Sequence, residues 1–472
     1  MRVLCAAAFM ALAACTTPPT YTPQPPDPLV ARLVADISPQ RIERRIQTLV
    51  GFQTRHTLSE TESDTRGIGA ARRWIQRDLE ACAKESGGRL QVTLDEYLEP
   101  AGNRMPRAAQ IVNVVATLPG TDPQSRDRLI VVSGHYDSRA GDVMDAASPA
   151  PGANDDASGV AAVMEMACVM AAQRFDATLV FLAVAGEEQG LLGATHWAQQ
   201  ARQKHWRIEA MATNDIIGSP MGETGERDPR RVRLFADGLA PVLGNALRTP
   251  RPGVDPPADG GDADRRALED LALAGGSRDL PTDQLGRHLK EAGERYLPGF
   301  RVHLIQRRDR YLRGGDHLPF LERGYAAVRF TEPFEHFGHQ HQDVRTENGV
   351  RLGDLPEFVD YAYVADVARI NTAGLATLAL APAAPRHVKI EALELGHDTT
   401  LRWDANAEAD LAGYRIVWRD TGSPVWQHRR DVGLVTRTTL DGVSKDDYVF
   451  GVQAVDRDGH ASLAGFPLPL RR

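Results

Sequence analysis

A set of residues that can bind metal ions or move protons stands between positions 135 and 215. Zinc accepts imidazole nitrogen and carboxylate oxygen at about 2.0–2.2 Å, and carboxylates can bridge two metal ions about 3.5–4 Å apart. One bridging aspartate, with one histidine and one further carboxylate for each ion, would satisfy such a pair. The pattern therefore predicts a two-metal centre formed from His135, Asp137, Asp155, Glu187, Glu188 and Asp215.

The spacing within two of these groups indicates separate roles for neighbouring side chains. Side chains alternate along an extended chain, so His135 and Asp137 share one side, and Asp137 can hold the imidazole of His135. The adjacent Glu187 and Glu188 point to opposite sides. If Glu188 binds a metal ion, Glu187 stays free to take a proton from a water molecule that zinc has made acidic. This is the general-base arrangement of a hydrolase.

Each group lies at the end of a segment with a strong secondary-structure signal. Short β-branched runs predict buried strands, and a longer run rich in Ala and Met predicts a helix. Open α/β sheets bind ligands at the carboxyl ends of their strands, so we expect these segments to converge. The predicted strands are residues 128–134 before His135, 177–185 before Glu187 and 208–212 before Asp215, and the predicted helix is 160–172, after Asp155.

Taken singly, each of these strings has an ordinary explanation. A Gly-His-x-Asp string is usually a turn, a Glu-Glu pair usually lies on the surface, and Asn-Asp-Asp is usually a turn or a helix cap. All of these strings occur together, at the ends of segments that are predicted to be buried, and this favours a metal site over the separate explanations.

The strings also resemble those of a known family. Residues 134–138, 152–159, 186–193 and 214–218 resemble, in family order, the co-catalytic di-zinc exopeptidases, and the resemblance spans about residues 40–380. Bacterial leucyl aminopeptidases, glutamate carboxypeptidases and glutaminyl cyclases belong to that family. The resemblance implies an α/β fold with a mixed central sheet flanked by helices, and two zinc ions as cofactors.

The resemblance implies a role for each residue. His135 and Asp215 are expected on the first zinc, and Glu188 on the second. Asp155 is expected to bridge both ions. Glu187 falls on the catalytic glutamate of the family, and Asp137 on the residue that orients the histidine.

The last zinc ligand of the family is a histidine that precedes an aspartate by four residues. His339 stands in that register before Asp343 and is the expected ligand. Gly338 replaces the aromatic residue that usually precedes this histidine, so His341 is the alternative.

Further polar residues are expected beside the site. Gly315-Asp316-His317 resembles a Ser-Asp-His string of the family, with glycine in place of serine, and this implies that Asp316 and His317 lie next to the zinc ligands. A Pro-, Gly-, Asp- and Arg-rich stretch at 248–283, followed by a helical pattern at 284–296, is expected either at the rim of the site or as a surface loop. Weak candidates for a substrate carboxylate are Arg307, Arg308 and Arg310.

The expected activity is that of a zinc-dependent exopeptidase acting on a peptide, with aminopeptidase specificity preferred. Carboxypeptidase and dipeptidase specificity stay open, because the strings fix the chemistry and not the end of the peptide that is read. Glutaminyl cyclisation is one alternative, but the glutaminyl cyclases of the family lack an equivalent of His135. A peptide-binding scaffold without catalytic activity is another, but such a relative is expected to have lost some of the metal-binding residues. The net charge of −8 and the lack of a basic cluster argue against nucleic acid as a partner, and the oligomeric state stays open.

The N-terminal residues predict export and attachment to a bacterial membrane. Residues 1–15 carry Arg2, an apolar run and a Leu-Ala-Ala-Cys string that resembles a lipoprotein cleavage box. Cys15 is therefore the expected lipidation site, with an ordinary secretory peptide as the alternative. Residues 16–35 are rich in proline and are expected to form an extended tether.

The remaining chain predicts two domains and two free thiols. Residues 36–380 are the expected peptidase domain, and 386–472 the expected all-β sandwich, similar to a fibronectin type III module. Cys82 and Cys168 lie in segments with helical patterns and are expected to be buried free cysteines, although one disulfide is allowed. Residues expected in the core of the sandwich are Trp403, Tyr414 and Tyr448.

Overall fold

The structure is a computed structural model that describes residues 25–239, 270–271 and 274–470. The strands of its larger part are β1 (Gln91–Glu99), β2 (Ala109–Leu118), β3 (Arg128–His135), β4 (Thr178–Val184), β5 (Arg207–Asn214), β6 (Arg231–Phe235), β7 (Arg301–Ile305) and β8 (Ala327–Thr331). Within the described residues they form an eight-stranded sheet in the order β1-β2-β4-β3-β5-β8-β6-β7.

The middle of this sheet is parallel. Strands β4, β3, β5 and β8 are neighbours in that order and run in the same direction, whereas β2 and β6 pair antiparallel with β4 and β8. His135 at the end of β3 pairs with Val184 at the end of β4, and Asn214 of β5 pairs with Phe330 of β8. The carboxyl ends of these strands therefore meet at one edge.

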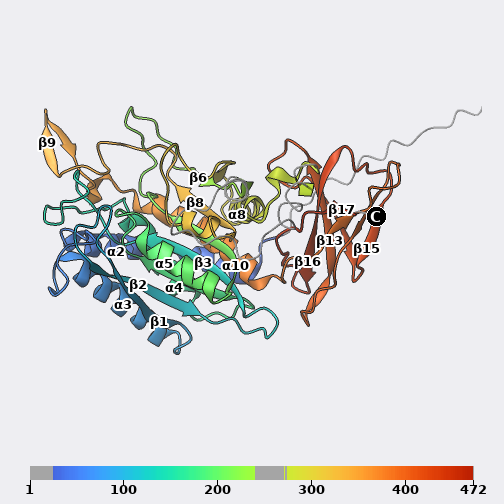
Figure 1. Ribbon diagram of the computed structural model, residues 1–472, viewed down its shortest axis with the longest axis horizontal. Coiled ribbons are helices and arrows are strands. Elements are labelled where there is room, and N and C mark those ends of the chain that lie inside the picture. The colour runs from blue at the N-terminus through green and yellow to red at the C-terminus, as the bar shows by residue number, and fades with distance from the viewer. Residues whose placement is uncertain (1–24, 240–269, 272–273, 471–472) are drawn as a thin grey trace, which may run out of the picture.

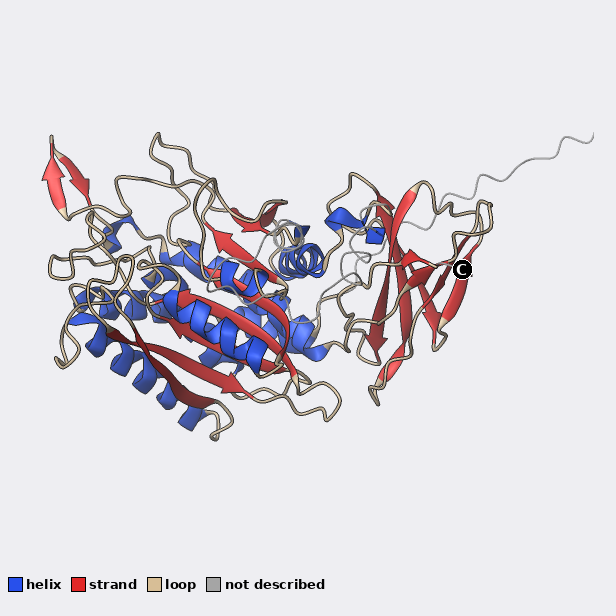
Figure 2. Ribbon diagram, viewed as in Figure 1, coloured by secondary structure: helices blue, strands red, loops and turns tan. Residues whose placement is uncertain are grey.

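Helices cover both faces of the sheet, which confirms the predicted fold class (Figures 1 and 2). α3, α4 and α10 lie against one face with α1 and α2 packed on them, and α5 and α9 lie against the other. The helices are α1 (Pro28–Asp36), α2 (Pro39–Gly51), α3 (Gly67–Glu85), α4 (Ala157–Met170), α5 (Leu192–Gln203), α8 (Pro281–Tyr296), α9 (Leu318–Leu321) and α10 (Tyr361–Leu380), with short 3-10 helices η1 (Gly276–Arg278) and η2 (Pro356–Phe358).

The two faces of the sheet bury separate apolar clusters. Every residue of β4 is buried, as expected for a parallel strand that is covered on both sides. Leu179 and Phe181 belong to the cluster beneath α4, whereas Val180 and Leu182 pack with Trp197 of α5 on the opposite face. This double covering holds the strand ends rigidly at the edge where the site residues lie.

The start of the described chain differs from the predicted tether. The tether was expected to continue to residue 35, but α1 begins at Pro28, and Val30 and Leu33 are buried in the main core. Asp27 caps this helix, and a proline in the first turn costs no hydrogen bond because the first N–H groups of a helix have no partner within it. The predicted signal peptide, Cys15 and the tether up to residue 24 lie outside the described residues.

The expectation of two free cysteines is wrong, because Cys82 and Cys168 form a disulfide. α3 packs against α4, and this brings the two Cα atoms to 5.1 Å from each other across a sequence separation of 86 residues. Closing a loop of that length stabilises a fold by about 4 kcal/mol in the chain-entropy account. The helical patterns alone did not indicate which helices pack together.

The C-terminal part has two facing sheets. Their strands are β11 (Lys389–Ile390), β12 (Thr399–Arg402), β13 (Leu411–Asp420), β14 (His428–Gly433), β15 (Arg437–Leu440), β16 (Tyr448–Asp456) and β17 (Leu468–Pro469). They pair as β15-β12-β11-β17 and β14-β13-β16 within the described residues. Trp403 and Tyr414 are buried between the sheets, and Tyr448 packs against them, as expected. The similarity to a fibronectin type III module stays a prediction.

A buried ion pair joins this sandwich to the rest of the protein. Arg419 of β13 donates to both carboxylate oxygens of Asp279, at 2.9 and 2.7 Å, and both residues are almost fully buried. Arg287 of α8 and Arg419 lie 5.0 and 5.5 Å from the ring centre of Trp426. Nη1 of Arg287 also lies 3.3 Å from Oδ1 of Asp279, so this carboxylate pairs with one arginine from each part of the protein.

The predicted insertion is described only in part. Its residues 248–269 and 272–273 lie outside the described part, whereas the helical pattern at 284–296 is confirmed by α8. A small hairpin of β9 (Arg345–Glu347) and β10 (Val350–Leu352) projects at the end of the molecule opposite the sandwich (Figure 1). Among the described helices, none combines the length and the apolar character that crossing a membrane requires.

Candidate metal centre

Two groups of possible metal ligands meet at the carboxyl edge of the parallel strands. His135, Asp155 and Asp215 form one group, and Asp155, Glu188 and His341 the other, and in each group the ligand atoms lie within 4.8 Å of one another. His135 Nε2 lies 3.1 Å from Oδ1 of Asp155, and His341 Nε2 lies 2.9 Å from Oδ2. Asp155 therefore belongs to both groups, one oxygen facing each histidine.

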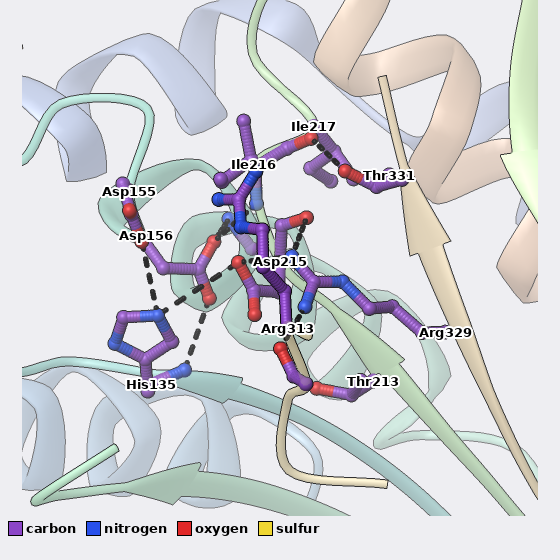
Figure 3. Close-up of polar contacts among 12 residues, drawn as sticks. His135, Asp155, Asp156, Thr213, Asp215, Ile216, Ile217, Arg313, Arg329 and Thr331 are labelled. Carbon is purple, nitrogen blue, oxygen red and sulfur yellow. Dashed lines mark hydrogen bonds and ion pairs between the residues drawn. The ribbon is translucent and has the colours of Figure 1, made fainter. Parts of the chain in front are cut away.

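Five separate segments carry these residues to the same edge, and Figure 3 shows three of the residues, His135, Asp155 and Asp215. His135 ends β3, Asp215 directly follows β5, and Glu188 follows β4 after a short turn. Asp155 comes from the loop before α4, and His341 from the loop after β8. The topological expectation that strand ends converge is met for these positions.

Asp156 ties the loop before α4 to β3. Its Oδ1 accepts a hydrogen bond from the N–H of Gly159 and caps α4, and its Oδ2 accepts one from the N–H of His135 at 3.0 Å. Asp354 fixes the other side of this loop, because its carboxylate accepts the N–H groups of Asn154 and Asp155, both at 2.7 Å. Asp156 and Asp354 thus set the direction of Asp155, and we did not predict either role from the sequence.

Asp137 connects His135 to the glutamate pair. Nδ1 of His135 lies 3.2 Å from the carbonyl oxygen of Asp137 and 3.6 Å from its Oδ1. The same carboxylate accepts the N–H groups of Glu187 and Glu188, at 3.2 and 3.1 Å. Asp137 therefore lies where an orienting residue is needed, between the imidazole and the turn that presents both glutamates.

Glu187 is partly buried at the centre of this negative region. Burial raises its pKa well above the usual range, and the charges of Asp215, Glu188 and Asp316 raise it further. A carboxylate in such surroundings binds a proton more readily than one in water. This is the property that a general base near neutral pH requires.

His339, the first choice for the last ligand, lies away from both groups. Its ring stacks between those of His336 and Phe358, each with centres 3.5 Å from the His339 ring. The alternative, His341, lies 3.1 Å from Oε1 of Glu188. Burial lowers the pKa of His341, but Glu188 and Asp155 outweigh this effect and raise it to about 10. The sequence register favoured His339, whereas the loop after β8 brings His341 to the two carboxylates.

Asp316 is buried near the site, and both of its carboxylate oxygens lack a hydrogen-bond partner. Burial raises its pKa to about 7, and its charge interactions include those with Asp215 and Asp137. His317, also buried, shares a hydrogen bond of 2.8 Å between Nε2 and the carbonyl oxygen of Arg308. Asp316 is thus placed beside the ligand groups, as expected, whereas His317 contacts the neighbouring loop.

The arginines suggested for a substrate carboxylate already have partners in the protein. Arg310 pairs with Asp309 and Glu335 at 3.1 Å each, and Arg308 pairs with Glu322. Arg307 lies over the ring of Tyr311, 3.7 Å from its centre. Their contacts indicate a structural role in this loop.

Arg329 is a buried cation at the site that we did not identify from the sequence. It lies in β8, is fully buried, and its Nη2 is 2.9 Å from Oδ1 of Asp215 (Figure 3). Burial opposes its charge, but Asp215, Asp309 and Glu187 outweigh that effect and raise its pKa. The sequence could have indicated this residue, because Arg329 lies within an apolar segment typical of a buried strand, and a buried charge needs a partner.

The donor set fits zinc. His135 Nε2 is buried and has no hydrogen-bond partner, although carboxylate oxygens surround it. Each group combines one imidazole with two carboxylates, and the shared Asp155 matches a bridging ligand. A buried nitrogen left unpaired beside carboxylates is what a metal ion would satisfy.

Known proteins share both the sequence and the fold of this chain. Residues 113–233 match the model of Peptidase family M28. A probable zinc metalloprotease of Pyrenophora teres f. teres is 43% identical over 447 residues, covering 95% of this chain and 88% of the relative. Another, of Pyricularia oryzae, is 46% identical over 452 residues, covering 94% and 86%.

A solved structure extends this comparison to the fold. LapA of Legionella pneumophila has a TM-score of 0.50 at 18% identity, covering 74% of this chain and 76% of that chain. The likeness at this identity concerns the fold alone. The family match and the long alignments to curated relatives together show that the chain is a zinc metalloprotease and belongs to peptidase family M28.

Proposed function

We propose that this zinc metalloprotease is an exopeptidase that holds two zinc ions and removes N-terminal residues from peptides. The observation that carries the two-zinc count is the shared carboxylate of Asp155, whose two oxygens face different histidines. The four strings support the exopeptidase chemistry, and the pairing of Arg308 and Arg310 with acidic residues favours the amino end of the peptide. His135 and Asp215 would hold one ion and Glu188 and His341 the other.

The chain's own residues supply the proton transfers. Zinc, when bound, lowers the pKa of a water molecule to about 7 and polarises the scissile carbonyl. Glu187 takes a proton from the attacking water and returns it to the leaving amine. Asp137 holds the N–H of Glu187, which fixes this base relative to His135.

Other activities on this fold are less well supported. A carboxypeptidase needs a free cation for the substrate carboxylate, and Arg308 and Arg310, proposed for that role, are paired with acidic residues. A glutaminyl cyclase would not need His135, which is buried among the predicted ligands. A binding scaffold would have no reason to keep Glu187 beside two intact ligand groups.

Removing the proposed base tests the chemistry. We expect Glu187→Gln to lower kcat by about 10²–10⁴-fold, because the amide cannot accept a proton, while zinc content stays at the wild-type value. The surface variant Glu357→Gln should keep full activity. Near-normal turnover of Glu187→Gln would show that another group acts as the base.

Removing the metal tests the cofactor and the specificity together. We expect the purified mature protein to bind two zinc ions and to release amine from aminoacyl chromogenic substrates, with activity lost on chelation and restored by zinc. Zinc without such release would contradict the aminopeptidase assignment and direct the search to N-blocked peptides. A zinc-free, active protein would contradict the metal mechanism itself.

The two histidines of the 339–341 loop offer a matched pair of variants. His341→Ala should bind one zinc instead of two, because Glu188 and Asp155 lose their imidazole partner. His339→Ala should keep both zinc ions, because its ring contacts only stacked neighbours. Zinc analysis of the two proteins after gel filtration distinguishes them, and the reverse result would make His339 the ligand.

We also propose that the enzyme is exported and lipid-anchored through Cys15. The support is the cleavage-box string in residues 1–15, together with the Cys82–Cys168 disulfide, which is typical of an oxidising compartment. Mass spectrometry of the N-terminal peptide from a bacterial membrane fraction should find a lipid-modified Cys15. A soluble mature protein without that modification would overturn the proposal.

A further inference from the structure

Arg329 stands between two buried carboxylates, only one of which belongs to the metal centre. Its Nη2 lies 2.9 Å from Oδ1 of Asp215, and its Nη1 lies 3.4 Å from Oδ2 of Asp309. The exposed fraction of each of the three residues is below a twentieth: 0% for Arg329, 3% for Asp215 and 4% for Asp309. In so dry an environment the guanidinium is held in place, and it holds Asp215 in return.

The main chain fixes the guanidinium further. Nη1 of Arg329 donates to the carbonyl oxygen of Gly314, and Nη2 approaches the carbonyl oxygen of Asp215 at 3.5 Å. Arg329 thus contacts both the side chain and the backbone of the residue that follows β5. A planar fork with several fixed contacts can set the orientation of a carboxylate, which a flexible ammonium cannot do as well.

Gly315 provides the space that this arrangement needs. A Cβ atom at this position would lie 2.8 Å from Nη1 of Arg329 and 3.1 Å from Oδ2 of Asp215. The backbone of Gly315 lies outside the left-handed region, so the lack of space, and not the conformation, excludes a side chain here. A residue without a side chain at this position leaves room for the guanidinium.

We propose that Arg329 is a positioning residue for the metal centre. Its guanidinium lies in the space beside Gly315 and orients Asp215 as a ligand of the zinc ion that His135 would also bind. This inference rests on the proposed two-zinc function. Removing a residue that orients a metal-binding side chain commonly lowers the metal affinity 10–100-fold.

The charge of Arg329 acts in the opposite direction and must be separated from its positioning effect. A cation beside a metal ion repels it, but Asp309 lies on the far side of the guanidinium and balances that charge. Removing Arg329 and Asp309 together leaves the net charge unchanged and deletes the contact with Asp215. Asp309 also accepts a hydrogen bond from Arg310 at 3.1 Å, and asparagine keeps a side-chain oxygen for it. The double variant Arg329→Met with Asp309→Asn therefore separates positioning from charge.

Zinc affinity, measured by competition with a chromogenic chelator, is the test. We expect the double variant to bind one zinc as wild type and the other 10–100-fold more weakly. Arg329→Lys keeps every charge but replaces the planar fork that faces Asp215 and Asp309, and it should show a loss in the same direction. It also keeps the test decisive if the double variant does not fold.

A remote buried arginine is the matched control. Arg128 lies at the opposite end of β3 from His135, is almost fully buried, and pairs with Glu209. Arg128→Met should lower the thermal unfolding midpoint and leave both zinc affinities unchanged.

Each outcome has one meaning. If the double variant and Arg329→Lys both bind two zinc ions with wild-type affinity, the positioning role of Arg329 is wrong and the two-zinc function stands. A matching loss in Arg128→Met would reduce the effect to general destabilisation and would also overturn the role. Wild-type protein without zinc would overturn the proposed function, and this inference with it.

Discussion

The burial of many carboxylates in one small volume is the constraint on which the rest of this structure depends. Repulsion between carboxylates at such short range destabilises the folded protein unless hydrogen-bond donors or cations stabilise the negative charges. Backbone N–H groups donate hydrogen bonds to the carboxylates of Asp137, Asp156 and Asp354. Arg329 forms an ion pair with Asp215. The remaining negative charge is concentrated around His135 and His341, where two divalent cations would balance it. The fold thus creates an electrostatic need for the metal ions its family uses.

Much of the site could be predicted because strand ends are a strong spatial signal. His135, Glu188 and Asp215 follow buried parallel strands, and the carboxyl ends of such strands share an edge whatever the loops do. Asp155 was predictable for a related reason, since a helix that begins beside the sheet must start near that edge. The mixed central sheet was implied by the family resemblance, while the sandwich was predicted from alternating apolar residues such as Trp403.

The rest depends on tertiary contacts that spacing does not encode. His339 and His341 differ by two positions in an irregular loop, and only the packing of that loop decides which ring reaches Asp155. The Cys82–Cys168 disulfide required knowing that α3 lies on α4. Arg329 was visible as a charge within an apolar strand, but its partner lies at the end of a different strand.

The Asp279–Arg419 pair affects whether the sandwich can be gained or lost in evolution as a separate domain. An exchangeable module is usually joined by a linker and a solvated surface, so that its loss leaves its neighbour intact. Here, deleting the sandwich would leave Asp279 with Arg287 and Gln284 of α8 as partners, but it would remove the two hydrogen bonds that Arg419 donates to this carboxylate. The two parts are therefore expected to melt together and to evolve together, and curated relatives align across 94–95% of the chain, sandwich included.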